Sequence, residues 1–217
     1  MTAVQTSRIF PPDLFSRFYL IVDDNWASRC SLLKVLQQAS EAGVKLVQYR
    51  NKTGSMKQAY EAALVLRKVA AERGMTFIVN DRCDLAVALE ADGVHLGQDD
   101  LPLLLARKVV GSKMLIGVST HNSEQVRLAT AEGADYLGFG PIFSTRTKAN
   151  HEPVVGIQGL AGVRNLTTLP IIAIGGIVPG SVPAIQGAGA NGVAVASAIL
   201  DAVDRPRVLA QFMVHCQ

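Results

Sequence analysis

Residues 48–52, QYRNK, place three polar side chains at alternate positions directly after the apolar run GVKLV. Gln48, Arg50 and Lys52 supply an amide, a guanidinium and an ammonium group. Because alternate side chains of a β-strand lie on one face, Gln48 and Arg50 are expected to point the same way, with Lys52 just past the strand end. Arginine pairs two N–H groups with phosphate oxygens and lysine adds a point charge, so the pattern predicts a polyanion site. A solvated charged loop is the alternative, and it is the simpler interpretation of Lys52 alone.

Carboxylates follow the next two apolar runs. Asn80 and Asp81 end the run MTFIVND, and Asp99 and Asp100 end DGVHLGQDD. Beside a phosphate site such carboxylates commonly hold Mg²⁺, which takes one or two of them together with waters and substrate oxygens. We therefore predict Asp81 and Asp100 as magnesium ligands. The alternative is that Asp81 turns the chain and that Asp99 or Asp100 caps the following helix; the spacing fits both interpretations.

Two further runs end in hydroxyl and basic groups. The segment GVSTHN offers Ser119 and His121, and the loop GPIFSTRTKAN carries Thr145, Thr147 and Lys148. Hydroxyls and a lysine on a loop hinged by Gly and Pro can close over an anion, while an ordinary polar surface loop is the competing interpretation. The histidines show no spacing with cysteine that is typical of a zinc site.

Small residues end the last two apolar runs. Gly175 and Gly176 follow PIIAI, and Ala196 and Ser197 follow NGVAV at the start of the last helical pattern. Backbone N–H groups at such turns bind phosphate, whereas close helix packing is the alternative. We favour phosphate here, and this second anion site predicts two phosphorylated molecules.

The elements that must position these residues alternate along the chain. Apolar runs rich in Val and Ile recur as RFYLIVD, VKLVQYR, MTFIVND, DGVHLG, MLIGVST, ADYLGFG, PIIAIGG and NGVAVAS. Segments with apolar residues three and four apart separate them, which predicts a parallel α/β sheet. Eight units at about 27 residues each match a single (β/α)₈ TIM barrel, in which strand carboxyl ends carry the active site. An open doubly wound sheet is the alternative, but no G-x-G-x-x-G motif follows the first strand.

Composition narrows the partners and the cellular setting. The net charge is +3, and Lys and Arg are scattered along the chain. We therefore expect the partners to be small phosphorylated molecules rather than nucleic acid or a membrane surface. Three widely spaced cysteines predict a reducing cytoplasm, and we find no export signal or membrane-spanning run. We expect residues 1–16 to form a flexible or surface-docked N-terminal lead and residues 17–217 to form the barrel. A homo-oligomer is compatible with this sequence.

In these motifs the sequence closely resembles the thiamine phosphate synthase family. The resemblance rests on QYRNK, similar to the family's Q-x-R-x-K, and on NDRCDLA, ADGVHLGQDD, GVSTH, FGPIFSTRTK and AIGGI in this order. It implies a transferase that condenses 4-amino-2-methyl-5-hydroxymethylpyrimidine diphosphate (HMP-PP) with thiazole phosphate, giving thiamine phosphate and pyrophosphate. It also implies a dissociative mechanism through a pyrimidine carbocation.

The resemblance also implies roles for individual residues. Mg²⁺ would be bound by Asp81 and Asp100, and Arg50, Lys52 and Lys148 would act in catalysis. HMP-PP would be held by Gln48, Tyr49, Arg50, Asn51, Lys52, Asn80, Ser119 and Lys148. Thiazole phosphate would be held by Thr145, Arg146, Thr147, Gly176, Ala196 and Ser197. The segment FSTRTK departs from the family at Ser144 and Arg146, where proline and a small residue are more usual, which bears on the stiffness of the loop.

Two other functions fit the same barrel. A thiazole tautomerase would use His121 as its acid and base and would not need the residues expected to bind pyrophosphate and metal. A sensor of a phosphorylated ligand would bind without turnover, since a fold does not fix a function. The presence of Gln48, Arg50, Lys52, Asp81 and Asp100 favours the synthase over both.

Overall fold

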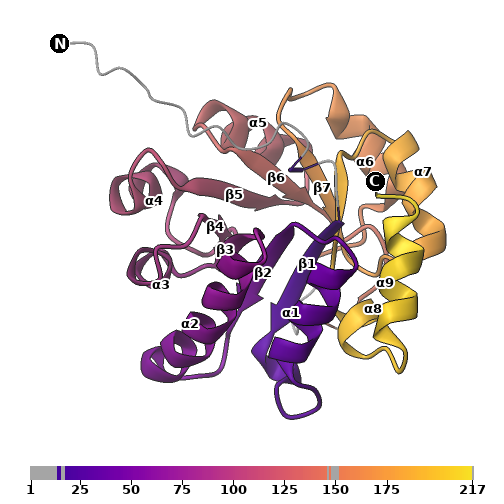
Figure 1. Ribbon diagram of the computed structural model, residues 1–217. Helices are drawn as coiled ribbons and strands as arrows, with labels where there is room; N and C mark the ends of the chain where they lie inside the picture. Colours follow the sequence, from indigo (N-terminus) through magenta and orange to yellow (C-terminus); the bar gives the residue numbers. More distant parts are fainter. Residues whose placement is uncertain (1–13, 16–17, 146, 148–151, 217) are drawn as a thin grey trace.

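A computed structural model describes residues 14–15, 18–145, 147 and 152–216, and it has the predicted barrel fold. Eight parallel strands are hydrogen-bonded in chain order, and β8 pairs with β1 to close the sheet (Figure 1). The strands are β1 (Phe18–Asp23), β2 (Leu46–Arg50), β3 (Thr76–Asn80), β4 (Gly93–Leu96), β5 (Leu115–Thr120), β6 (Tyr136–Phe139), β7 (Ile171–Ile174) and β8 (Gly192–Val195). Closure excludes the open doubly wound sheet and confirms the (β/α)₈ class.

Helices surround the strands, as Figure 1 shows. They are α1 (Leu32–Glu41), α2 (Met56–Glu72), α3 (Cys83–Ala88), α4 (Leu103–Val110), α5 (Ser123–Ala131), α6 (Gly156–Arg164), α7 (Val182–Gly187), α8 (Ser197–Leu200) and α9 (Arg205–Met213), with short 3₁₀ turns η1 (Asp24–Trp26) and η2 (Pro179–Ser181). Ser55 caps α2 by accepting the Gln58 N–H, and the Gln58 side chain accepts the Ser55 N–H in return. Among the described residues, no helix has the length and apolar character needed to span a membrane.

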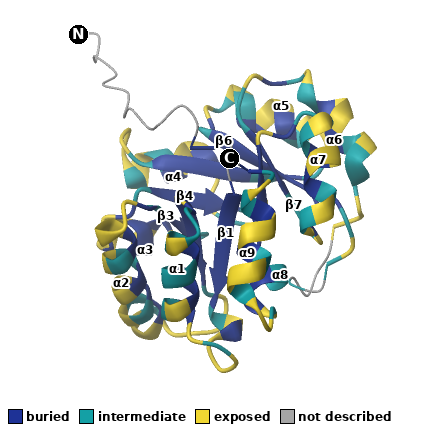
Figure 2. Cartoon of the chain, turned by 45° about the vertical axis from the view of Figure 1, so that its right-hand side comes forward, coloured by how far each residue is buried: buried dark blue, intermediate teal, exposed yellow. Residues whose placement is uncertain are grey.

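Two apolar layers hold the barrel together. Outward-facing strand residues pack against the helices, which bury one face each; on α2 this face is Ala59, Ala63, Leu66 and Ala70. Inward-facing residues fill the barrel itself, among them Ile21, Leu46, Ile78, Leu115 and Ile172. Burial on both faces explains why the strands are nearly continuous apolar runs, and Figure 2 shows the strands buried inside the partly exposed helices.

Part of the N-terminal segment lies inside the barrel. Leu14 and Phe15 are buried among the inward-facing residues, and the Phe15 ring stacks on Tyr136 with ring centroids 4.6 Å apart. These two residues therefore pack against the barrel, whose inward-facing residues offer them apolar contacts. The flexible or surface-docked lead expected over residues 1–16 stays a prediction. Residues 1–13 and 16–17 lie outside the described part, and the domain boundary at residue 17 stays a prediction.

Candidate active site

A cavity of about 410 Å³ opens where the strands end and extends into the barrel. Its volume is in the range of small-molecule sites in enzymes. Almost every described residue that the sequence singled out lines it: Gln48, Arg50, Lys52, Asn80, Asp81, Asp99, Asp100, Ser119, His121, Thr145, Thr147, Gly175, Gly176, Ala196 and Ser197. The barrel thus brings together residues from seven of the eight strand ends, as expected for this fold.

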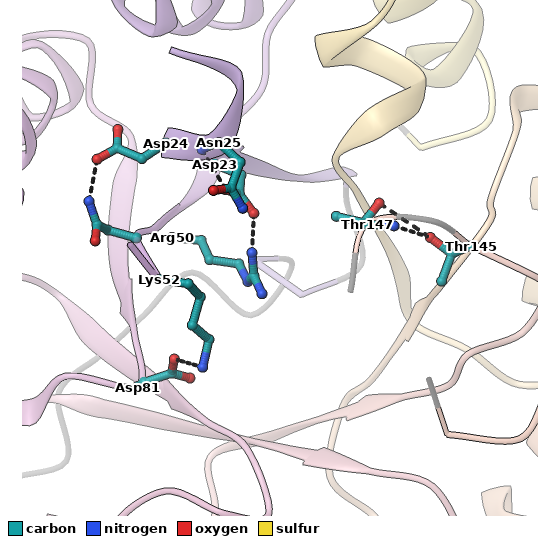
Figure 3. Close-up of polar contacts among 9 residues, drawn as sticks. Asp23, Asp24, Asn25, Arg50, Lys52, Asp81, Thr145 and Thr147 are labelled. Atoms are coloured by element: carbon teal, nitrogen blue, oxygen red, sulfur yellow. Dashed lines mark hydrogen bonds and ion pairs between the residues drawn. The ribbon is translucent and has the colours of Figure 1, made fainter. Parts of the chain in front are cut away.

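The ends of β1 and β2 fix the position of Arg50. Asp23 and Arg50 are register partners, and the Asp23 carboxylate accepts a hydrogen bond from the Arg50 guanidinium (Figure 3). The other carboxylate oxygen of Asp23 accepts the Asn25 N–H at 2.9 Å. The Asp23 side chain is 0% exposed and that of Arg50 is 11% exposed, so each charge needs the other to be tolerated in the interior. The guanidinium is therefore held at the cavity wall in a fixed orientation.

Lys52 and two carboxylates form the neighbouring part of the wall. The Lys52 ammonium lies 2.5 Å from an Asp81 carboxylate oxygen, and the Asp100 carboxylate accepts the Gly97 N–H at 2.6 Å. Burial and the adjoining carboxyl of Asp100 raise the pKa of Asp81 to about 6, against the opposing effect of Lys52. A carboxylate whose charge is disfavoured by a neighbouring carboxylate fits a site for a divalent cation. Among the described residues, no group of three or more His, Cys, Asp or Glu side chains is placed to hold a metal ion.

Tyr49 and Asn51 lie outside this cavity. The alternation that points Gln48 and Arg50 into the barrel points Tyr49 outward, where its hydroxyl donates to Asp24 at 2.6 Å. The Asn51 side chain donates to the same Asp24 carboxylate. Both side chains therefore brace the end of β2, and their contact with HMP-PP stays a prediction.

The floor of the cavity contains polar side chains that the sequence analysis did not select. Tyr19, His95 and Tyr136 line the cavity together with Gln48 and Ser119, and hydrogen bonds join all five. Their positions on the inward face follow from strand alternation. Aromatic residues on that face are common core residues, however, so alternation alone gave no reason to assign them chemistry.

The loops after β6, β7 and β8 form the opposite wall. Figure 3 shows Thr145 and Thr147 across from Arg50 and Lys52. The hydroxyl oxygens of Thr145 and Thr147 are 3.2 Å apart. Gly176 has φ +62, and a Cβ there would lie 2.4 Å from the Ser144 carbonyl oxygen, so this turn needs glycine. Arg146 and Lys148 were also expected here, and both lie outside the described residues. Glu152 lines the same wall and was not anticipated.

Comparison with known proteins assigns this chain to a family. The family model described as thiamine monophosphate synthase matches residues 18–199. The chain is 45% identical to a thiamine-phosphate synthase of Chloroflexus aurantiacus, over 87% of each chain, and 46% identical to one of Pelotomaculum thermopropionicum, over 80% of each. It superimposes on the thiamine phosphate pyrophosphorylase of Pyrococcus furiosus with a TM-score of 0.82 and 31% identity, covering 92% of this chain and 95% of the other. The chain therefore belongs to the thiamine-phosphate synthase family of transferases.

Proposed function

We propose that this enzyme transfers the aminopyrimidinylmethyl group of HMP-PP to the ring nitrogen of thiazole phosphate and releases pyrophosphate. The observation that supports the proposal most directly is the pairing of two unlike walls around one cavity. Cationic and carboxylate side chains of β2, β3 and β4 form one wall, and hydroxyl and glycine loops after β6 and β7 form the other. Two phosphorylated substrates can then lie with their reacting atoms between the walls.

The β2 wall suits the diphosphate. Arg50, already oriented by Asp23, presents a guanidinium fork. Lys52 adds a point charge, and Asn80 lines the same part of the cavity. Asp81 and Asp100 would hold Mg²⁺, which supplies positive charge against the phosphate oxygens when it is bound. Lys148, outside the described residues, is proposed as a further cation.

The opposite wall suits thiazole phosphate, a monoester with fewer charges. Thr145 and Thr147 offer hydroxyl groups, and the turn at Gly176 and the segment Ala196 and Ser197 bring backbone close to the cavity. Neutral donors of this kind bind a phosphate and keep the more strongly cationic wall for the diphosphate. Arg146 is proposed as a contact on the same loop. Gln48 and Ser119, deeper in the barrel, are proposed to bind the pyrimidine ring.

In the proposed mechanism the bond between the pyrimidine methylene carbon and the pyrophosphate oxygen breaks first, and its electron pair leaves with pyrophosphate. Arg50 and Lys52 stabilise the charge that grows on the leaving group. The lone pair of the thiazole nitrogen then forms the new C–N bond to the cationic carbon, which leaves a thiazolium ring. Positioning this nitrogen beside the carbon, within the barrel, favours capture by thiazole over capture by water.

The setting proposed for this reaction is the cytoplasm. Cys30, Cys83 and Cys216 are unpaired in the structure, which is the usual state of cysteine in a reducing compartment. Small phosphorylated molecules are the proposed partners, and a homo-oligomer stays a prediction.

The test is a coupled assay of both products. Purified protein is incubated with HMP-PP and thiazole phosphate, with and without Mg²⁺, and thiamine phosphate and pyrophosphate are measured together. Equal amounts of both, formed only with the metal, support the proposal. Release of pyrophosphate without thiamine phosphate would indicate hydrolysis, and isomerisation of the thiazole alone would indicate the tautomerase. A pyrimidine carrying an electron-withdrawing substituent should react more slowly if a carbocation forms.

A further inference from the structure

Five side chains inside the barrel form one continuous hydrogen-bonded array, called here the interior network: Gln48, Tyr19, Tyr136, His95 and Ser119. Gln48 Nε2 donates to the Tyr19 hydroxyl at 2.9 Å, and the Tyr19 and Tyr136 hydroxyl oxygens are 3.0 Å apart. His95 Nδ1 lies 3.0 Å from the Tyr136 hydroxyl, and His95 Nε2 lies 2.9 Å from Ser119 Oγ. The network therefore joins the two residues proposed to bind the pyrimidine ring.

The barrel leaves space for this network. A Cβ at position 117 would lie 2.1 Å from Cζ of Tyr136, and one at position 138 would lie 3.1 Å from Cε1 of His95. Glycine at position 117 on β5 is therefore needed for the Tyr136 ring as it lies, and a side chain at position 138 on β6 would crowd the His95 ring. Such an arrangement is more than apolar filling requires, because Leu or Ile would fill the same layer without buried polar atoms.

The number of protons in the interior network restricts its possible states. Burial raises the pKa of the Tyr19 hydroxyl, and burial together with Tyr19 raises that of Tyr136, so each tyrosine keeps one O–H. The two directions below are those of a neutral His95 imidazole, which has one N–H. Each link needs one proton, which then leaves two self-consistent directions for the whole series of hydrogen bonds.

The two directions present opposite chemistry to a ligand. With Gln48 Nε2 on Tyr19, Tyr19 donates to Tyr136, Tyr136 donates to His95 Nδ1, and His95 Nε2–H donates to Ser119. Gln48 then presents its carbonyl oxygen to the cavity, and the Ser119 hydroxyl is left to donate. In the reverse direction Gln48 presents its NH₂ group and Ser119 accepts.

We propose that Tyr19, Tyr136 and His95 are positioning residues that hold the direction in which Gln48 Nε2 donates to the Tyr19 hydroxyl. The cavity then selects a ring with an exocyclic amino group and an acceptor nitrogen over its oxo counterpart. The inference rests on the proposed function and extends it to the choice of pyrimidine. An amino group donates to the Gln48 carbonyl oxygen, and a ring nitrogen accepts from Ser119. An oxo ring requires the amide of Gln48 to turn and every proton in the network to move. Buried groups left unpaired in this way discriminate strongly between substrates.

The test compares HMP-PP with the analogous diphosphate in which a 4-oxo group replaces the 4-amino group. Values of kcat/KM for both, with thiazole phosphate and Mg²⁺, are measured for the wild-type protein and for Tyr19→Phe, which removes one oxygen atom from the network. We expect Tyr19→Phe to lower kcat/KM for the amino substrate about tenfold and to narrow the amino-to-oxo ratio by about tenfold or more, because the Gln48 amide is then able to turn. Tyr60→Phe, a tyrosine on α2 outside the cavity, should keep the wild-type ratio.

A second variant and a binding assay separate the outcomes. Tyr136→Phe breaks the network at its centre and should narrow the ratio as well, so the inference can be tested even if Tyr19→Phe does not fold. Calorimetric titration with each diphosphate alone should show the same change in preference without turnover. The inference would be overturned by folded variants that keep the wild-type ratio of kcat/KM for the amino and oxo substrates. It would also be overturned if kcat/KM fell equally for both substrates. Failure of the wild-type protein to couple HMP-PP at all would instead overturn the proposed function.

Discussion

Asp23 and Arg50 end neighbouring strands in register, and the carboxylate of one accepts a hydrogen bond from the guanidinium of the other inside the barrel mouth. The pair does more than neutralise charge. Because Asp23 also accepts the Asn25 N–H, its carboxylate is fixed from both sides, and the fork of Arg50 is oriented before a substrate arrives. An oriented donor loses little conformational freedom on binding, which is the condition for strong electrostatic stabilisation of a leaving group.

Replacing this carboxylate should therefore weaken catalysis although Asp23 is not itself proposed to contact substrate. Asp23→Asn keeps the size of the side chain but removes its charge, so Arg50 should lose its fixed orientation. We expect kcat/KM for HMP-PP to fall by about 10- to 100-fold, the scale of losing one charged hydrogen bond of about 1.5–3 kcal/mol. Steady-state kinetics with saturating thiazole phosphate would measure this.

Asp24→Asn is the matched control. Asp24 is the next residue along the chain, but its carboxylate accepts from Tyr49 and Asn51 on the outer side of β2. A loss of stability with much smaller effect on kcat/KM is expected. Equal losses of kcat/KM in both variants would show that the strand end as a whole, rather than the orientation of Arg50, controls activity.

Arg50 itself should not tolerate lysine. Arg50→Lys keeps the positive charge but loses the planar fork that donates to Asp23. We expect kcat/KM to fall by about 100-fold in Arg50→Lys and further in Arg50→Ala, with circular dichroism unchanged. Near-wild-type activity of Arg50→Lys would mean that charge alone is sufficient at this position.

The sequence predicted the fold and most of the cavity lining because both depend on local patterns. Strand alternation and the convergence of parallel strand ends placed Gln48, Arg50 and Asp81 in one site, as the structure shows. Strand alternation places Tyr49 on the opposite face from Gln48 and Arg50, and in the structure its hydroxyl donates to Asp24. Tyr19 and Tyr136 could not be identified in this way, since their contact joins residues 117 positions apart and depends on a closed barrel.

Asp81 is expected to lower the stability of the metal-free protein while it provides a ligand for Mg²⁺. Asp81→Asn removes a charge that burial and Asp100 both disfavour, and asparagine tolerates the positive φ of 63 at this position. We expect Mg²⁺-dependent activity to be lost, while the metal-free variant melts roughly 2–4 °C above the wild type at pH 7.5, the shift given by about 1 kcal/mol in a domain of this size. Thermal unfolding in the presence of a chelator would measure the second effect. A lower melting temperature would mean that the ion pair with Lys52 outweighs the cost of burial.

The raised pKa of Asp81 also predicts how the difference in stability between Asp81→Asn and the metal-free wild type depends on pH. The folded-state pKa of about 6 lies above the ordinary value of 3.8, so between these values the folded protein binds more protons than the unfolded chain. The stability that Asp81 contributes is therefore present below about pH 3.8 and is lost as the pH rises through about 6. The advantage of Asp81→Asn over the metal-free wild type should grow across this range and then level off. An advantage that is constant with pH would contradict the raised pKa.

The turn after β7 should control affinity for thiazole phosphate separately from affinity for HMP-PP. Gly176→Ala places a methyl group 2.4 Å from the Ser144 carbonyl oxygen and 2.8 Å from Cβ of Phe143, so the segment that leads to Thr145 must move. We expect KM for thiazole phosphate to rise about tenfold, the effect of losing about 1.4 kcal/mol of binding, with a smaller change for HMP-PP. Gly162→Ala on α6 is the control, because a Cβ there meets nothing within 4 Å, and it should leave both KM values unchanged. If Gly176→Ala raised both KM values equally, the two walls of the cavity would not bind their substrates independently.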